Sequence, residues 1–236
     1  MPSATTTHPG DAPRRRRAEI TRLEGLSDGV FAFAATLLVV SLDVPRSYAD
    51  LVVNLRGLLA FGLSFLFLIQ IWYAHNGFFR RYGLQDPATL VLNAVLLFVV
   101  LFFVYPLKFL ALAFVSFFRM GGGERVRLTL EELAGAFAIY GAGFVAIFLC
   151  VALLYWHASR ARELALGPVE RFDALTQAGH YLLFVAVGGL SILLALAQTG
   201  VRVGLPGWIY GLIGPLSYWH GSRRGRRRAR LAKEAA

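Results

Sequence analysis

Six apolar segments, each long enough or nearly long enough to cross a bilayer, constrain this chain more than any other feature. A helix needs about 20 apolar residues to cross a hydrocarbon core of roughly 30 Å. The runs are continuously apolar, which disfavours the alternating strands of a barrel, and open sheets leave unpaired backbone groups in lipid. We therefore expect an all-α integral membrane protein with six transmembrane helices. The predicted segments are residues 27–44, 58–79, 90–112, 133–156, 174–197 and 205–219.

The charged residues indicate how these segments are oriented. Lysine and arginine number 24 against 14 acidic residues, and the arginines gather at residues 14–17 and 223–230. With the N terminus inside, 17 of the 24 basic residues lie on the cytoplasmic side, which predicts that both termini are cytoplasmic. Arginine runs can bind nucleic acid. Beside apolar segments they favour anionic lipid at the bilayer surface, so we expect a lipid partner and no nucleic acid.

The segments and the basic runs divide the chain into three parts. Residues 1–17 have a basic composition without the apolar core of a signal peptide, and we expect a disordered tail. Residues 18–221 form the predicted six-span domain, and residues 222–236 form a basic C-terminal tail. The single cysteine, Cys150, excludes an intrachain disulfide. The sequence has no close His/Cys pair, so we expect no metal site.

The first apolar segment differs from the others because it carries polar residues at defined positions. Ser27 and Asp28 stand at its start and Asp43 near its end, with no charged residue between them. An ionisable group at the membrane edge is costly when it faces lipid, so Asp28 is expected to face protein or water. Helix capping by Ser27 or Asp28 is an equally simple interpretation.

An apolar stripe runs along the same segment. Phe33, Leu37 and Val40 follow i, i+4, i+7 spacing and therefore share one helical face. Thr36 lies beside this stripe and carries the only hydroxyl in the middle of the segment. In an arbitrary membrane helix such a stripe is a packing seam.

A resemblance to a known family changes this interpretation. The run from Arg22 reads Arg-x4-Ser-Asp-Gly-Val-Phe-Ala-x-Ala-x-Thr-Leu-Leu-Val, followed by an acidic residue and Val-Pro. It resembles the prokaryotic branch of the endolysosomal potassium channel family, transmembrane protein 175. Ser64-Phe65, Trp72 with His75, Leu92-Asn93 and Tyr105-Pro106 match further family positions, so the resemblance covers about residues 18–112.

The resemblance implies a homotetramer of six-span subunits in the prokaryotic plasma membrane, with the first span lining a K⁺-permeable pore. It implies no cofactor and no metal beyond the permeant K⁺. The family's apolar constriction, which gates by dewetting, falls on Phe33, Leu37 and Val40, and its selectivity-layer hydroxyl falls on Thr36. A hydrogen-bonded network beside the pore helix is implied for six residues, namely Arg22, Ser27, Asp28, Trp72, His75 and Asn93.

Two residues depart from the family pattern, and several other functions compete with a channel. Leu26 stands where phenylalanine is usual, and Phe33 stands where isoleucine or leucine is usual, which puts the width of the constriction in doubt. A transporter would need ionisable groups near a midplane, and an enzyme would need a nucleophile-base set or paired carboxylates at one depth. The chain offers neither, so we expect no enzyme. A non-conducting membrane scaffold or lipid-binding protein stays open as the alternative.

Overall fold

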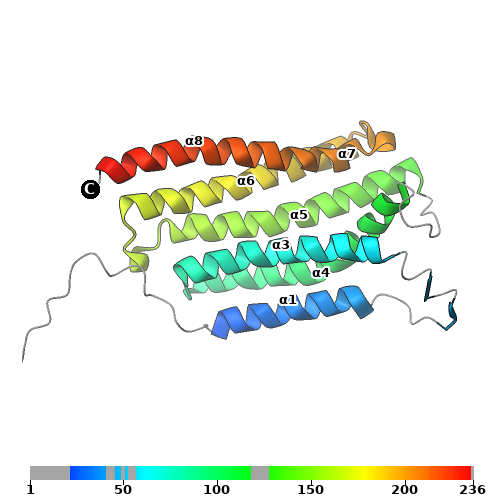
Figure 1. The fold of residues 1–236 in the computed structure, drawn as a ribbon, viewed down its shortest axis with the longest axis horizontal. Helices are drawn as coiled ribbons and strands as arrows, with labels where there is room; N and C mark the ends of the chain where they lie inside the picture. Colours follow the sequence, from blue (N-terminus) through cyan, green and yellow to red (C-terminus); the bar gives the residue numbers. More distant parts are fainter. Residues whose placement is uncertain (1–21, 41–45, 49–50, 53–56, 118–127, 235–236) are drawn as a thin grey trace, which may run out of the picture.

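The computed structural model describes residues 22–40, 46–48, 51–52, 57–117 and 128–234, and all regular elements in these ranges are helices. The predicted tail over residues 1–17 lies outside the described residues. The longer helices run side by side in one bundle (Figure 1). They are α1 (Arg22–Val40), α3 (Leu58–Tyr82), α4 (Pro87–Phe117), α5 (Leu130–Ala158), α6 (Pro168–Leu196) and α8 (Ile213–Glu234). The short pieces are η1 (Arg162–Leu164), η2 (Val201–Val203), α7 (Leu205–Trp208) and η3 (Ile209–Leu212).

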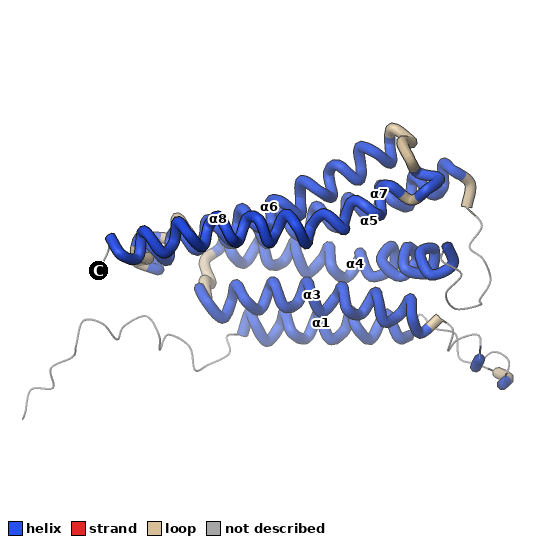
Figure 2. The backbone as a smooth tube through the Cα atoms, turned by 45° about the horizontal axis from the view of Figure 1, so that its top comes forward, coloured by secondary structure: helices blue, strands red, loops and turns tan. Residues whose placement is uncertain are grey.

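Successive long helices alternate in direction, so that Arg22 and the end of α8 lie at the same end of the bundle (Figures 1 and 2). We call this the Arg22 end and the opposite one the Val40 end. α3 and α5 finish at the Arg22 end, and α4 and α6 begin there. Which end faces the cytoplasm stays a prediction at this point.

Five of the described helices are long and apolar enough to cross a bilayer: α1, α3, α4, α5 and α6. They correspond to the first five predicted segments, so the all-α membrane fold is confirmed at this level. Most of their ends differ from the predicted limits by several residues, as for α4, which continues to Phe117. α5 begins at Leu130 because Thr129 caps it: the Thr129 amide donates to Glu132 Oε2 at 2.7 Å, and Thr129 Oγ1 accepts from the Glu132 amide at 3.2 Å.

The sixth predicted segment, residues 205–219, is helical in pieces. It comprises α7, η3 and the first turns of α8. Pro206, Gly207, Gly211, Gly214 and Pro215 fall within it, and these residue types disfavour a regular α-helix. α8 then continues through the arginine run to Glu234, so most of the predicted basic tail is a helix.

Aromatic rings fill the centre of the bundle. Phe67 of α3, Phe103 of α4 and Tyr140 of α5 pack with ring centroids 5.3–6.2 Å apart. Phe144 and Phe148, one turn apart on α5, are fully buried and extend this cluster toward α6. Rings at these separations contribute favourable contacts beyond the area they bury. The core therefore fixes α5 between its neighbours.

Close packing between α5 and α6 depends on Gly188. A Cβ atom there would lie 2.8 Å from Val145 Cγ2 and 3.0 Å from Phe144 Cδ1, whereas one at the adjacent Gly189 would meet nothing within 4 Å. We expect Gly188→Leu to destabilise the protein by about 1–3 kcal/mol through overpacking. The midpoint of thermal unfolding in detergent measures this, with Gly189→Leu as the matched control. Equal midpoints for the two variants would contradict the packing argument.

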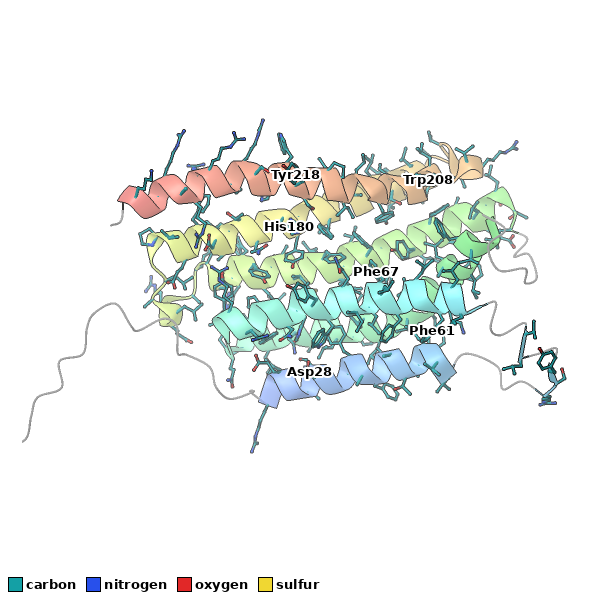
Figure 3. The ribbon with its side chains drawn as sticks, viewed as in Figure 1. Asp28, Phe61, Phe67, His180, Trp208 and Tyr218 are labelled. Carbon is teal, nitrogen blue, oxygen red and sulfur yellow. The ribbon has the colours of Figure 1, made fainter. Side chains whose placement is uncertain are left out.

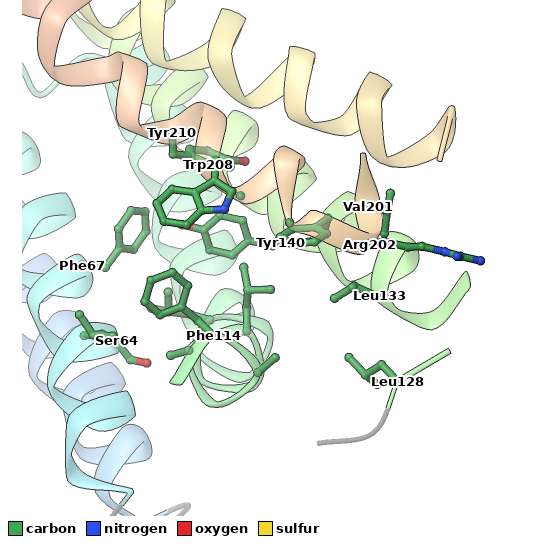
Figure 4. A pocket seen from close by; sticks show the side chains of 18 residues that line it. Ser64, Phe67, Phe114, Leu128, Leu133, Tyr140, Val201, Arg202, Trp208 and Tyr210 are labelled. Atoms are coloured by element: carbon green, nitrogen blue, oxygen red, sulfur yellow. The ribbon is translucent and has the colours of Figure 1, made fainter. Parts of the chain in front are cut away.

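A cavity of about 420 Å³ lies toward the Val40 end, between α3, α4, α5 and the η2–η3 segment. Phe67, Phe114, Tyr140 and Trp208 surround it (Figure 4). The lining is mainly apolar, and among the described residues it includes none from α1. The cavity is therefore separate from the predicted constriction and network residues, although Ser64 of the family pattern lines it.

Candidate functional site

α1 presents one buried face to the rest of the subunit, which it contacts through α3 and α4. The large residues Phe31 and Leu38 on this face are 5% and 0% exposed. The 3–4 residue spacing of the buried positions is that of a single helical stripe. The stripe consists of Leu23, Ser27, Phe31, Ala34 and Leu38.

The predicted constriction residues lie on the other face. Phe33 is 57% exposed and Val40 is 70% exposed, while Leu37 is half-buried. Thr36 is exposed as well, and its hydroxyl donates a hydrogen bond of 2.9 Å to the Ala32 carbonyl. The stripe predicted from the sequence is therefore free of packing within its own subunit, except at Leu37.

A buried chain of hydrogen bonds joins α1, α3 and α4. Asn93 Nδ2 donates to Ser27 Oγ at 3.0 Å, and Ser27 Oγ donates to the Leu23 carbonyl at 2.8 Å. Asn93 Oδ1 lies 2.7 Å from His75 Nε2. Because this amide oxygen can only accept, His75 carries the proton on Nε2. Each of Ser27, His75 and Asn93 is at most 1% exposed.

Aromatic residues hold the histidine of this chain in place. The His75 ring lies 5.5 Å from Phe31 of α1 and 4.6 Å from Phe79, one turn further along α3. A buried polar group is costly unless it is hydrogen-bonded. The Ser27–Asn93–His75 chain therefore favours one rotation of α1 about its own axis, the one that points Ser27 at Asn93.

A second link lies one residue further along α1. Trp72 Nε1 donates to Asp28 Oδ1 at 2.8 Å. Asp28 is exposed at the Arg22 end of α1 (Figure 3). Because Ser27 and Asp28 lie within α1, which includes Arg22, the capping interpretation is wrong. Their side chains instead join helices.

Of the six predicted network residues, the structure brings five into two neighbouring groups. Ser27, Asn93 and His75 form one group, and Asp28 and Trp72 form the other. Arg22 is exposed, and within the described residues no hydrogen bond or ion pair joins it to the other five.

Sequence reasoning missed one ionic junction at the Arg22 end. Asp173 Oδ2 accepts from Arg81 Nη2, and Asp173 Oδ1 accepts from Arg228 Nε, both at 2.8 Å. The junction ties α3, α6 and α8 together. The only available signal was an acidic residue close to the start of an apolar segment, and nothing in the sequence names its partners.

No group of three or more His, Cys, Asp and Glu residues is placed to hold a metal ion within the described ranges. The polar residues on α1 instead serve contacts between helices or lie on its exposed face.

Known proteins resemble this chain in sequence. The profile of the family described as endosomal/lysosomal potassium channel TMEM175 matches residues 22–104, which include α1 and the network. A potassium channel of Marivirga tractuosa is 36% identical over 231 residues, with 93% of each chain covered. A potassium channel of Chamaesiphon minutus is 30% identical over 200 residues, covering 78% of this chain and 91% of the relative.

Solved structures agree with the sequence relatives. A threonine-to-alanine variant of the potassium channel MtTMEM175, crystallised with a nanobody-MBP fusion protein, matches with a TM-score of 0.79 and 34% identity, covering 94% of this chain and all of that one. The Chamaesiphon minutus homologue of the lysosomal potassium-selective channel TMEM175 matches with a TM-score of 0.57 and 25% identity, covering 86% and 96%. The chain therefore belongs to the TMEM175 family, which is a family of ion channels and not of enzymes.

Proposed function

We propose that this chain is the subunit of a homotetrameric potassium-permeable channel, in which α1 of each copy lines a passive cation pore. The observation that carries the proposal is the exposed face of α1. Relatives named as potassium channels support the permeant ion, and channel structures of the same fold support the architecture.

The exposed face of α1 has the spacing of a helix that packs against copies of itself. Its residues alternate by four and three positions, as in the a and d positions of a heptad. Every one of them is exposed within the subunit, so the face is available to other copies. The positions are Arg22, Leu26, Gly29, Phe33, Thr36 and Val40.

An apolar ring on this face would set the permeability. Four copies of Phe33 and Val40, with the half-buried Leu37 at the edge of the face, would surround the axis at successive levels, where narrow apolar walls favour loss of water. Partial dehydration costs Na⁺ more than K⁺, because the smaller ion holds its water more strongly. Thr36 already donates its proton to Ala32, so its oxygen keeps lone pairs that can face a passing cation.

The hydrogen-bonded groups on the opposite face of α1 would position this ring. Adjacent residues of a helix are separated by about 100°, so a small rotation of α1 would exchange the constriction residues for others. The Ser27–Asn93–His75 chain and the Asp28–Trp72 bond oppose such a rotation. We infer that they are positioning residues for the pore.

The placement in the membrane follows from the two ends of the bundle. We infer that the Arg22 end is cytoplasmic in a multi-pass protein of a prokaryotic plasma membrane, because most basic residues belong to it. A single channel domain over residues 18–221 would be flanked by basic segments that contact anionic lipid. Passive conduction of this kind needs no cofactor.

Ion flux from purified protein in liposomes tests the proposal. We expect K⁺ flux in excess of Na⁺ flux, and we expect Phe33→Ala and Leu37→Ala to change the rate or the K⁺/Na⁺ ratio severalfold. Phe102→Ala is the matched control, because Phe102 on α4 is 74% exposed but lies outside α1. Flux that is equal in all variants would place the pore elsewhere, and no flux from a folded tetramer would favour the membrane scaffold.

A further inference from the structure

The basic C-terminal segment is a built part of the subunit. α8 carries its arginines along a continuous helix up to Glu234 and packs against α6. Arg228 is held by Asp173, whose side chain is only 12% exposed. The Arg224 guanidinium lies 5.5 Å from the centre of the Phe172 ring. These contacts fix the orientation of α8, and thereby decide which arginines point away from the bundle.

Four exposed arginines share one face of α8 and surround a surface hollow together with Leu231. They are Arg223, Arg226, Arg227 and Arg230, at i, i+3, i+4 and i+7. One of them, Arg227, also has its guanidinium carbon 6.0 Å from the centre of the Phe172 ring. All four are exposed, and none forms an ion pair with an acidic residue in the described part of the chain. Like charges at this spacing repel one another, so a ligand with several negative oxygens would be stabilised there.

The expected position of this face relative to the membrane indicates which kind of molecule would supply the negative oxygens. α6 has 29 residues and is therefore about 43 Å long, which exceeds a hydrocarbon core of roughly 30 Å. Phe172 and Asp173 lie in its first two turns, which would be near the lipid headgroups if α6 is centred in the core. Tyr218 and Trp219 precede the arginines on α8, and Tyr218 points away from the bundle (Figure 3). Exposed Tyr and Trp are typical of the membrane interface.

We propose that the arginine face of α8, formed by Arg223, Arg226, Arg227 and Arg230, binds the phosphate of an anionic phospholipid headgroup. Planar guanidinium groups suit phosphate oxygens because they donate in pairs. Stacking of Arg223 over Trp219, with its guanidinium carbon 3.8 Å from the ring centre, preorganises one of them. The site rests on the proposed contact between basic segments and anionic lipid, and assigns it to one face of one helix.

Lipid retention by the purified full chain tests the site without requiring ion flux. Native mass spectrometry would count phosphatidylglycerol molecules bound per subunit during a titration, with phosphatidylcholine as the uncharged comparison. In the test variant all four arginines of the face are changed to glutamine. The matched control changes four exposed arginines of the same end that lie outside α8, namely Arg80, Arg160, Arg162 and Arg171, and alters the net charge equally.

We expect the test variant to bind phosphatidylglycerol more weakly by at least about tenfold, since it removes all the guanidinium groups that would donate together to one headgroup phosphate. The control should stay within about twofold of the unmodified protein. Equal losses in both variants would indicate diffuse attraction and overturn the site, while leaving the broader lipid contact intact. No preference for phosphatidylglycerol in the unmodified protein would overturn both. Inorganic phosphate or pyrophosphate binding as tightly as the lipid would assign the face to a free phosphate, and would also overturn the lipid site.

Discussion

Asn93→Leu is expected to lower both the stability of the subunit and its ion flux. The leucine removes the acceptor of His75 Nε2 and the donor to Ser27 Oγ, and these atoms are buried where water does not replace them. An unsatisfied buried polar group costs about 1–3 kcal/mol. The loss also frees α1 to rotate, which would misplace the constriction. Thermal unfolding in detergent and liposome flux measure the two effects.

The matched control for this change is Asn76→Leu. Asn76 directly follows His75 on α3 and is half-buried, and it forms no hydrogen bond with another side chain within the described residues. The same chemical change should therefore have a much smaller effect. If both variants unfolded at the same temperature and conducted alike, the buried chain would have no special role in positioning α1.

Val40→Lys is expected to reduce K⁺ flux by more than about tenfold. In the proposed tetramer it would place four positive charges around the pore at the Val40 end. Four charges about 8 Å from a permeating cation would together raise its energy by about 2 kcal/mol, even with the dielectric constant of water. The reduction should weaken as ionic strength rises, because salt screens exposed charges.

Two further substitutions at Val40 separate charge from size. Val40→Gln introduces a polar side chain without charge, and Val40→Glu introduces the opposite charge. Liposome flux should fall with lysine alone, and glutamate should leave or increase it. A lysine variant that conducts as well as the glutamine variant would indicate that Val40 does not face the ion pathway.

Hydropathy located the membrane helices because a run of apolar residues is sufficient to define a span. It did not find their ends, since these depend on local hydrogen bonds such as the Thr129 cap of α5. It also ended the last segment where the arginines begin. Arginine is a good helix former, so α8 continues past the point where the apolar segment ends. The length of a helix therefore does not show how much of it lies in the membrane.

The polar groups around α1 could also be predicted only in part. The family motif predicted that Ser27, Asp28, Trp72, His75 and Asn93 belong together, and the structure places them in two adjacent groups. The resemblance implied Arg22 as a sixth member, but within the described residues no hydrogen bond or ion pair joins it to either group. The Asp173 junction was beyond sequence reasoning, because its two arginines are 92 and 55 residues away.

The one-sided attachment of α1 has a consequence for the co-expression of variant and unmodified subunits. Among the described residues of one subunit α1 packs mainly against α3 and α4, and its other side would be completed by neighbouring copies in the proposed tetramer. A substitution at Phe33 or Val40 in a single copy would therefore disturb the constriction that all four copies form together. When variant and unmodified subunits are co-expressed in equal amounts, most assemblies would contain at least one variant copy. Pore-face variants should then be dominant, whereas variants that prevent folding should be recessive.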